Sequence, residues 1–310
     1  MKKKLISMTL ALSCAVVWSF AFPLIKIGLA LFEVAPGDTG AKTLFAGIRF
    51  FAAGVFVLIT SKFAGRDMRI KTKNDLFGVL LFGLVNTALH YFFYYIGLSN
   101  QSGSRSAVID SMSTFILIVL ACIIFKDEKM TALKAAGCLL GICGIITVNL
   151  GGQTGESFTL SGDGMLILSA VFSALGGILT RIVSKNTDIL AATGISLSFG
   201  GMLMMIFGFF MGGRLNVINV QGVLIMLALI LISVYGFSVY NKLLCSNPVG
   251  DIAIFNSLIP ILGVLLSCLI LSEPFRIQYA AAGFLSAAGV LLVNIHKENS
   301  KNNSYREETI

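Results

Sequence analysis

Asp110 is an acidic residue inside a strongly apolar stretch of the sequence, SAVIDSMSTFILIVL, which runs from Ser106 to Leu120. A carboxylate within a lipid bilayer is costly, so it usually pairs with another group or takes part in transport. Ser106, Asp110, Ser113 and Thr114 follow one another at spacings that place them on one face of a helix. We therefore hypothesise that Asp110 carries a coupling proton or holds a substrate ammonium group. The alternative is a structural carboxylate held by hydrogen bonds near the outer surface.

A second polar stripe lies in the segment GLVNTALHYFFYYIGL, where Asn86, His90 and Tyr94 recur every four residues. Such a stripe usually faces protein or water rather than lipid, which favours the lining of a cavity. The short connection SNQSG makes this helix an antiparallel neighbour of the helix that carries Asp110. At about 1.5 Å per residue, His90 and Asp110 lie at a similar depth and could form a pair. The alternative for the stripe is anchoring at the membrane surface, which is our expectation for Tyr95.

Four further side chains are candidates for the same cavity. Trp18, the only tryptophan, lies mid-span and could stack on an aromatic or cationic substrate, or simply pack in the core. Asn256 and Ser257 precede a proline in IFNSLIP, where a freed carbonyl could join them, although ordinary hydrogen bonds between helices would also explain them. Tyr235 is the most deeply placed aromatic residue of SVYGFSVYNK. We expect no cofactor or metal ion, because the six cysteines lack the spacing of metal ligands.

Other polar residues of the apolar segments are expected to be structural. Lys26 and Arg49 lie near segment ends, where long basic side chains usually extend to water. Tyr240 is expected to anchor its helix at the cytoplasmic surface. A stripe of small residues predicts close helix packing rather than a site. The stripe consists of Ser169, Ser173, Gly176, Gly177 and Thr180.

Composition and hydropathy define the elements that must position these residues. Of the 310 residues, 56% are hydrophobic and 12% are charged, with a mean hydropathy of +0.89, whereas soluble domains contain about 25% charged residues. These values indicate an all-α polytopic membrane protein, in which each span needs about 20 apolar residues. Pro23 should kink the first span. We predict ten transmembrane helices over 5–31, 42–61, 75–98, 103–125, 131–150, 162–184, 189–211, 220–244, 248–271 and 276–295.

The net charge of +8 is explained by orientation in a membrane, and we expect no binding of nucleic acid. Most of the 23 lysines and arginines fall in loops that are cytoplasmic if the N-terminus is cytoplasmic. We therefore expect a multi-pass protein of the cell (cytoplasmic) membrane with both termini in the cytoplasm. Residues 297–310 are predicted to be a polar, disordered cytoplasmic tail.

The sequence contains an internal repeat. The segment EKMTALKAAGCLLGICGIITVN, which begins at Glu128, resembles EPFRIQYAAAGFLSAAGVLLVN, which begins at Glu273. We therefore predict two five-helix halves, 1–150 and 162–296, joined by a linker over 151–161. Because five is odd, the second half enters the membrane inverted, and inverted repeats characterise secondary transporters with a binding site between the halves. The alternative is a duplicated membrane scaffold that transports nothing.

Several segments resemble the EamA repeats of the drug/metabolite transporter superfamily. They are VVWSFAFPLIKIG, IRFFAAG, ILIVLACIIFKDEKMT and IPILGVLLSCLILSEPF. The resemblance implies ten helices, cytoplasmic termini, alternating access, and a cavity lined mainly by helices 1, 3, 4, 6, 8 and 9. It implies no particular substrate. Where the family often has a proline midway along the fourth helix, this sequence has Thr114, while the ninth helix retains Pro260.

Other functional classes are disfavoured by missing motifs. No P-loop, HExxH or GxSxG stretch occurs, which argues against a primary pump and an enzyme. Neither half offers a repeated charged ring or a carbonyl filter, which argues against a channel. We expect a secondary transporter, a monomer or homodimer in the lipid bilayer, with protons as the coupling ion. The resemblance to the EamA repeats implies alternating access and the export of small metabolites such as amino acids. The runner-up is a multidrug or organic-cation exporter.

Overall fold

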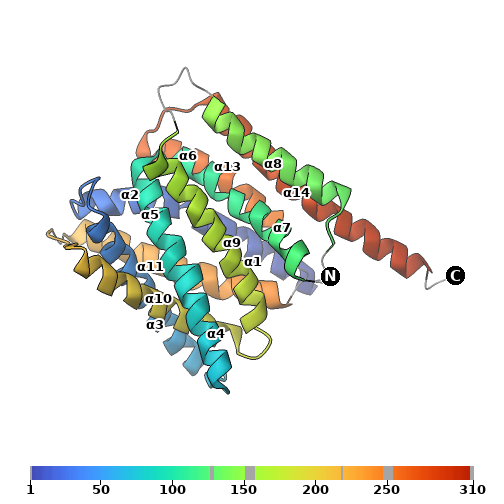
Figure 1. The fold of residues 1–310 in the computed structure, drawn as a ribbon, viewed down its shortest axis with the longest axis horizontal. Coiled ribbons are helices and arrows are strands. Elements are labelled where there is room, and N and C mark those ends of the chain that lie inside the picture. Colours follow the sequence, from blue (N-terminus) through green and yellow to red (C-terminus); the bar gives the residue numbers. More distant parts are fainter. Residues whose placement is uncertain (1, 126–128, 151–157, 218, 247–253, 308–310) are drawn as a thin grey trace.

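A computed structural model describes residues 2–125, 129–150, 158–217, 219–246 and 254–307, and the regular structure of these residues is entirely helical (Figure 1). Most predicted spans correspond to one or two consecutive helices in chain order. The helices are α1 (Lys2–Ser19), α2 (Ala21–Leu31), α3 (Thr39–Phe63), α4 (Lys73–Gly83), η1 (Leu84–Leu89), α5 (His90–Asn100), α6 (Gly103–Asp110), α7 (Met112–Ile124), α8 (Ala132–Leu150), η2 (Leu160–Gly164), α9 (Met165–Val183), α10 (Ile189–Phe210), α11 (Val220–Ser246), η3 (Ile254–Ser257), α13 (Leu258–Leu271) and α14 (Ile277–Glu307).

Seven helical segments of the described chain are long and apolar enough to cross a membrane, and three shorter apolar helices accompany them. The three shorter helices cover 132–144, 258–271 and 277–292, within the predicted fifth, ninth and tenth spans. Large apolar side chains on the outer surface are exposed, for example Phe63 at 89% and Phe210 at 81%. Such an exposed apolar surface is what a lipid solvent requires.

The two predicted halves are interleaved in space, and α3 of the first half packs along α10 of the second. Glycines repeat every seven residues on both helices, at Gly40, Gly47 and Gly54 of α3 and at 194, 201 and 208 of α10. A Cβ atom on Gly47 would lie 2.6 Å from the backbone nitrogen of Met205. The two backbones therefore approach closely because side chains are missing at the interface.

Three of the spans are interrupted along their length. The first is broken between α1 and α2 at Phe20, and Pro23 lies in the first turn of α2, which confirms the predicted kink. The third contains the π-helix η1, a feature that often marks functional sites. The fourth is broken at Ser111 between α6 and α7, without a proline.

The C-terminal segment differs from the prediction. Instead of a disordered tail, α14 continues as one helix from Ile277 to Glu307, and it extends beyond the rest of the bundle (Figure 1). Once a helix has formed, adding each further residue costs little, and the tail contains good helix formers such as lysine and glutamate.

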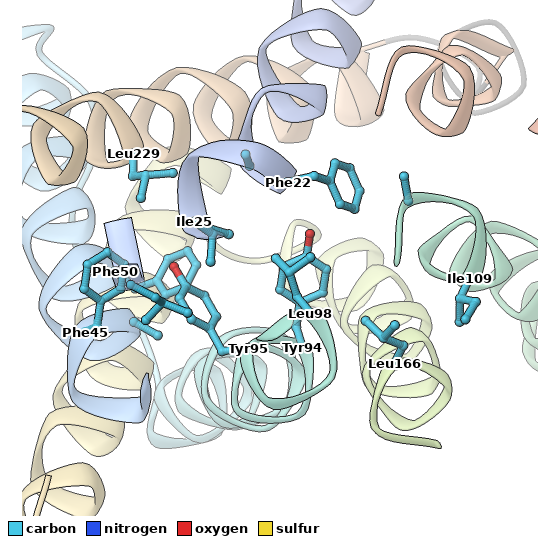
Figure 2. Packing of buried hydrophobic residues seen from close by; sticks show 14 of the residues in the cluster. Phe22, Ile25, Phe45, Phe50, Tyr94, Tyr95, Leu98, Ile109, Leu166 and Leu229 are labelled. Carbon is cyan, nitrogen blue, oxygen red and sulfur yellow. The ribbon is translucent and has the colours of Figure 1, made fainter. Parts of the chain in front are cut away.

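The main core lies where α2, α3 and α5 meet (Figure 2). Phe22 on α2 faces Tyr94 on α5, with ring centroids 6.1 Å apart, and Tyr95 lies beside Phe45 of α3 at 6.0 Å. Tyr95 is 0% exposed, so the expectation that it anchors the helix at the membrane surface is wrong. Its hydroxyl has a partner inside the protein, which removes the reason to seek the interface.

Candidate functional site

A cavity of about 190 Å³ lies between the two halves and is lined by side chains from both. All but two of the predicted site residues line it. These are Trp18, Asn86, His90, Tyr94, Asp110, Ser113, Thr114 and Asn256. They come from α1, η1, α5, α6, α7 and η3, so the helix interruptions described above all lie beside the cavity.

Asp110 is the last residue of α6, immediately before the break at Ser111. Its backbone carbonyl accepts a hydrogen bond from Ser113 Oγ at 2.8 Å, and Ser111 Oγ donates to the carbonyl of Val108 at 2.6 Å. These hydroxyls satisfy carbonyls that the interrupted helix leaves free. The Asp110 carboxylate itself forms no hydrogen bond or ion pair with any described residue. A partly buried carboxylate without a protein partner is available for water, a proton or a cationic ligand.

His90 is buried beside the cavity, with 8% of its surface exposed. Its Nδ1 lies 3.2 Å from the carbonyl oxygen of Asn86, and its ring centroid is 4.1 Å from that of Tyr91. In the neutral ring this bond requires the hydrogen on Nδ1 and leaves Nε2 as an acceptor. His90 and Asp110 line the same cavity, as their similar depth predicted, but no hydrogen bond or ion pair joins them.

An aromatic wall forms another side of the cavity. The ring of Trp18 meets Phe237 and Tyr240 of α11 edge-on, at centroid distances of 5.7 and 4.9 Å. Asn256 Nδ2 donates to the Tyr240 hydroxyl at 2.6 Å. Tyr240 therefore lines the cavity and is not the cytoplasmic anchor that the sequence suggested. Its hydroxyl is paired inside the bundle, so it need not reach the interface.

Arg49 also lines the cavity and was not predicted to do so. It is 2% exposed, so the expectation that it extends to water is wrong. Its Nε donates to Ser233 Oγ at 3.0 Å, and its Nη1 donates to the Tyr95 hydroxyl at 2.9 Å. Its guanidinium carbon lies 4.8 Å from the centroid of the Phe50 ring. Polar and aromatic partners within the bundle thus replace the water that an isolated span would need.

The small-residue stripe of α9 serves two purposes. Ser173, Gly177 and Thr180 line the cavity, where the sequence predicted only packing. Gly176 does provide close packing, because a Cβ atom there would lie 2.1 Å from Asn86 Oδ1. Helical periodicity defined the stripe, but it did not show that part of the stripe borders an open space.

Two predicted residues are placed elsewhere or lie outside the described side chains. Tyr235 is outside the cavity lining and 36% exposed, and its hydroxyl lies 2.6 Å from Ser13 Oγ. Ser257 belongs to η3 by its backbone, and its side chain lies outside the part that the structure describes. In the described ranges, no group of three or more His, Cys, Asp or Glu side chains could hold a metal ion.

One end of the bundle, where α5 is followed by α6, is closed by bonds between the two halves. Arg105 Nε and Asp163 Oδ1 are 2.6 Å apart, and both side chains are 1% exposed. The Asp163 carboxylate also accepts from Gln101 Nε2 at 2.8 Å. Lys26, expected to extend to water, donates instead to the carbonyl of Gln101 at 2.6 Å.

Glu273, which follows α13 in the second half, reinforces this closed end. Its carboxylate accepts from the backbone nitrogen atoms of Gly103 and Ser104 at 2.7 and 3.0 Å, and from Ser104 Oγ at 2.8 Å. A carboxylate at a helix N-terminus satisfies free N–H groups and interacts favourably with the helix dipole. Toward the opposite end the lining reaches Thr180, in the last turn of α9. The bonds between the halves thus lie at one end of the bundle, and the cavity lining extends toward the other end as far as Thr180.

Repeated helical halves around a cavity that contains polar and charged side chains define a multi-pass membrane transporter. The chain belongs to the EamA-like transporter family, whose model matches residues 5–150 and again residues 160–295. The two matches coincide with the repeats found in the sequence.

Individual proteins with related sequences are transporters by name. The uncharacterized transporter YvbV of Bacillus subtilis is 25% identical, over 92% of this chain and 90% of its own length. A protein of Salmonella typhimurium named "Probable amino-acid metabolite efflux pump" is also 25% identical, over 92% of this chain and 93% of its own. One solved crystal structure, 16% identical, covers 94% of this chain and 98% of its own with a TM-score of 0.68, which shows a common fold.

Proposed function

We propose that this protein is a secondary transporter that exports small metabolites, amino acids or related amphiphilic solutes, across the cytoplasmic membrane by alternating access. The observation that carries the proposal is the Asp110 carboxylate, which lies in a cavity between the halves and has no partner among the residues that the structure describes. The cavity volume of about 190 Å³ limits the solute to a small molecule. The name of the Salmonella relative agrees with this class of substrate.

The proposed topology has ten spans with both termini in the cytoplasm, as the distribution of basic residues favours. In this orientation the end closed by Asp163 and Glu273 is the outer end. The structure then corresponds to the state in which the cavity extends toward the cytoplasm. Release on the outside requires the bonds of Asp163 and Glu273 to open while the inner end closes.

Asp110 provides a simple means of coupling. One carboxylate can hold a proton or a substrate ammonium group, and the two compete because both neutralise the same charge. We assume that the transporter changes conformation only when Asp110 is neutralised. Asp110 then binds the substrate during the outward step and a proton during the return step. This is the mechanism of a proton antiporter with a single shared site.

A second candidate function is the export of organic cations. It is favoured by the aromatic rings of Trp18, Phe237 and Tyr240, which stand in the same cavity as Asp110. Aromatic faces attract quaternary and other organic cations, and a carboxylate adds charge complementarity.

The test is to reconstitute the purified protein in proteoliposomes and measure the flux of amino acids and organic cations, with and without a pH gradient. Asp110→Asn should abolish gradient-driven flux, since the amide can neither take up a proton nor neutralise an ammonium group. Asp67→Asn is the matched control, because Asp67 is an exposed carboxylate away from the cavity. Undiminished and still pH-dependent flux in Asp110→Asn would show that Asp110 has only a structural role.

A further inference from the structure

Arg49 carries a positive charge that the described residues do not neutralise. Its hydrogen-bond acceptors are Ser233 Oγ, the Leu229 carbonyl at 3.2 Å and the Tyr95 hydroxyl, and all three are uncharged. No described carboxylate forms an ion pair with it. A buried charge without an opposite charge is strongly unfavourable, so the site is electrically incomplete without an anionic ligand.

The three acceptors occupy only part of the guanidinium group. Nε and Nη1 are bonded, whereas Nη2 has no partner among the described residues, and the side chain lines the cavity. The bonds to Ser233 and Tyr95 hold the plane of the group in place. A guanidinium fixed in this way loses little further freedom when it binds a carboxylate, which is the anion that its planar geometry matches.

The opposite charge in the same cavity is that of Asp110. Tyr91 and Tyr94 line this cavity together with Arg49 and Asp110. The cavity thus contains a positive group, a negative group and two tyrosines, together with the apolar surface of Trp18. A solute with both charges would satisfy both residues at once, whereas an organic cation would leave Arg49 unneutralised.

We propose that Arg49 binds the carboxylate of the substrate while Asp110 faces its ammonium group, so that the transported solute is a small zwitterion, an amino acid. This inference rests on the proposed transport function and selects between its two candidate substrate classes. Arg49 is then the residue that discriminates against amines, because an amine has no carboxylate for it to bind. The hydroxyls of Ser233 and Tyr95 act as positioning groups for the guanidinium.

The experiment uses two pairs of probes in proteoliposomes: leucine with isopentylamine, and phenylalanine with phenethylamine. In each pair the amine lacks only the carboxylate. The wild type should transport each amino acid at least about tenfold better than its amine, the effect of one charge-assisted interaction. Arg49→Gln should lower amino-acid flux by about tenfold and bring the ratio of amino-acid to amine flux close to one, and Arg49→Lys should retain part of the preference.

Lys42→Gln is the matched control. Lys42 lies on the same helix, is also 2% exposed and bonds to the Pro36 carbonyl, but it does not line the cavity. It should keep the wild-type ratio of amino acid to amine. Equal loss of both probes in Arg49→Gln, or a wild type without preference, would overturn the assignment.

The ratio of amino-acid to amine flux in the wild type tests the role of Arg49 even if an Arg49 variant does not fold. A wild type that moves the amines in an Asp110-dependent manner, but not the amino acids, overturns the role of Arg49 and keeps the transporter. A wild type that moves no member of a broad panel overturns the proposed function as well.

Discussion

Trp18 is held in place by contacts that make it a reporter of the cavity. Its ring meets Phe237 and Tyr240 edge-on, and it lies against Gly236 of α11. A Cβ atom on Gly236 would be 2.3 Å from Trp18 Nε1, so only glycine leaves room for the indole here. Because Trp18 is the only tryptophan, its fluorescence reports on this position alone.

Gly236→Ala should displace the indole toward the cavity and reduce the space for a solute. We expect a shift of the tryptophan emission and a flux lowered by about tenfold or more, as small misplacements near a binding site commonly cause. Gly283→Ala is the control, since its Cβ would meet its nearest neighbour at an ordinary 3.7 Å. Unchanged emission and flux in Gly236→Ala would show that the indole position does not shape the site.

At the scale of the elements, the pairing of α3 with α10 is one of the main contacts that join the two halves. Gly47 and Gly201 face each other across this interface, and a Cβ on Gly201 would lie 2.3 Å from the backbone nitrogen of Phe51. Backbone atoms cannot move aside as a flexible side chain can, so the helices themselves would have to separate. The seven-residue glycine spacing on both segments is visible in the sequence and is typical of a close contact between membrane helices.

Gly47→Ala should therefore destabilise the protein by about 1–3 kcal/mol, the usual cost of overpacking. Gly78→Ala in α4 is the control. A Cβ atom on this helical glycine would meet only Val183, at an ordinary contact distance of 3.7 Å. This control should be neutral or stabilising by up to about 1 kcal/mol, since alanine favours the helix. Thermal unfolding in detergent measures both, and equal melting temperatures would contradict the tight α3–α10 contact.

For the molecule as a whole, the alternating access that we propose requires the end bonded by Asp163 and Glu273 to open. Ser104 Oγ of α6 lies 3.7 Å from Cys268 Sγ of α13, next to the bonds made by Glu273. A covalent link here would fix the closed end. The chain already supplies one of the two thiols that such a link needs.

Ser104→Cys should form a disulfide with Cys268 under oxidising conditions and stop transport, because the end of the bundle that Glu273 bonds across could no longer open. A reductant should restore the flux. The double variant Ser104→Cys with Cys268→Ala lacks the second thiol and should be insensitive to oxidation. Full transport by the cross-linked protein would show that this end does not move during the cycle.

The sequence alone determined the membrane character, the repeat, the approximate ends of the helices and eight of the residues that line the cavity. Periodicity places Asn86, His90 and Tyr94 on one face, and hydropathy places His90 and Asp110 at one depth. Both properties belong to a single helix and its solvent, so they can be read without knowing the neighbours.

The tertiary structure decided which residues each helix face contacts. Arg49 turns inward because α11 and α5 supply Ser233 and Tyr95, whereas Tyr235 bonds to Ser13 outside the cavity. His90 and Asp110 share a depth without bonding, and Glu273 reaches the start of α6 from the other half. The rotation and spacing of helices arise from contacts between residues far apart in the chain, and no local pattern contains that information.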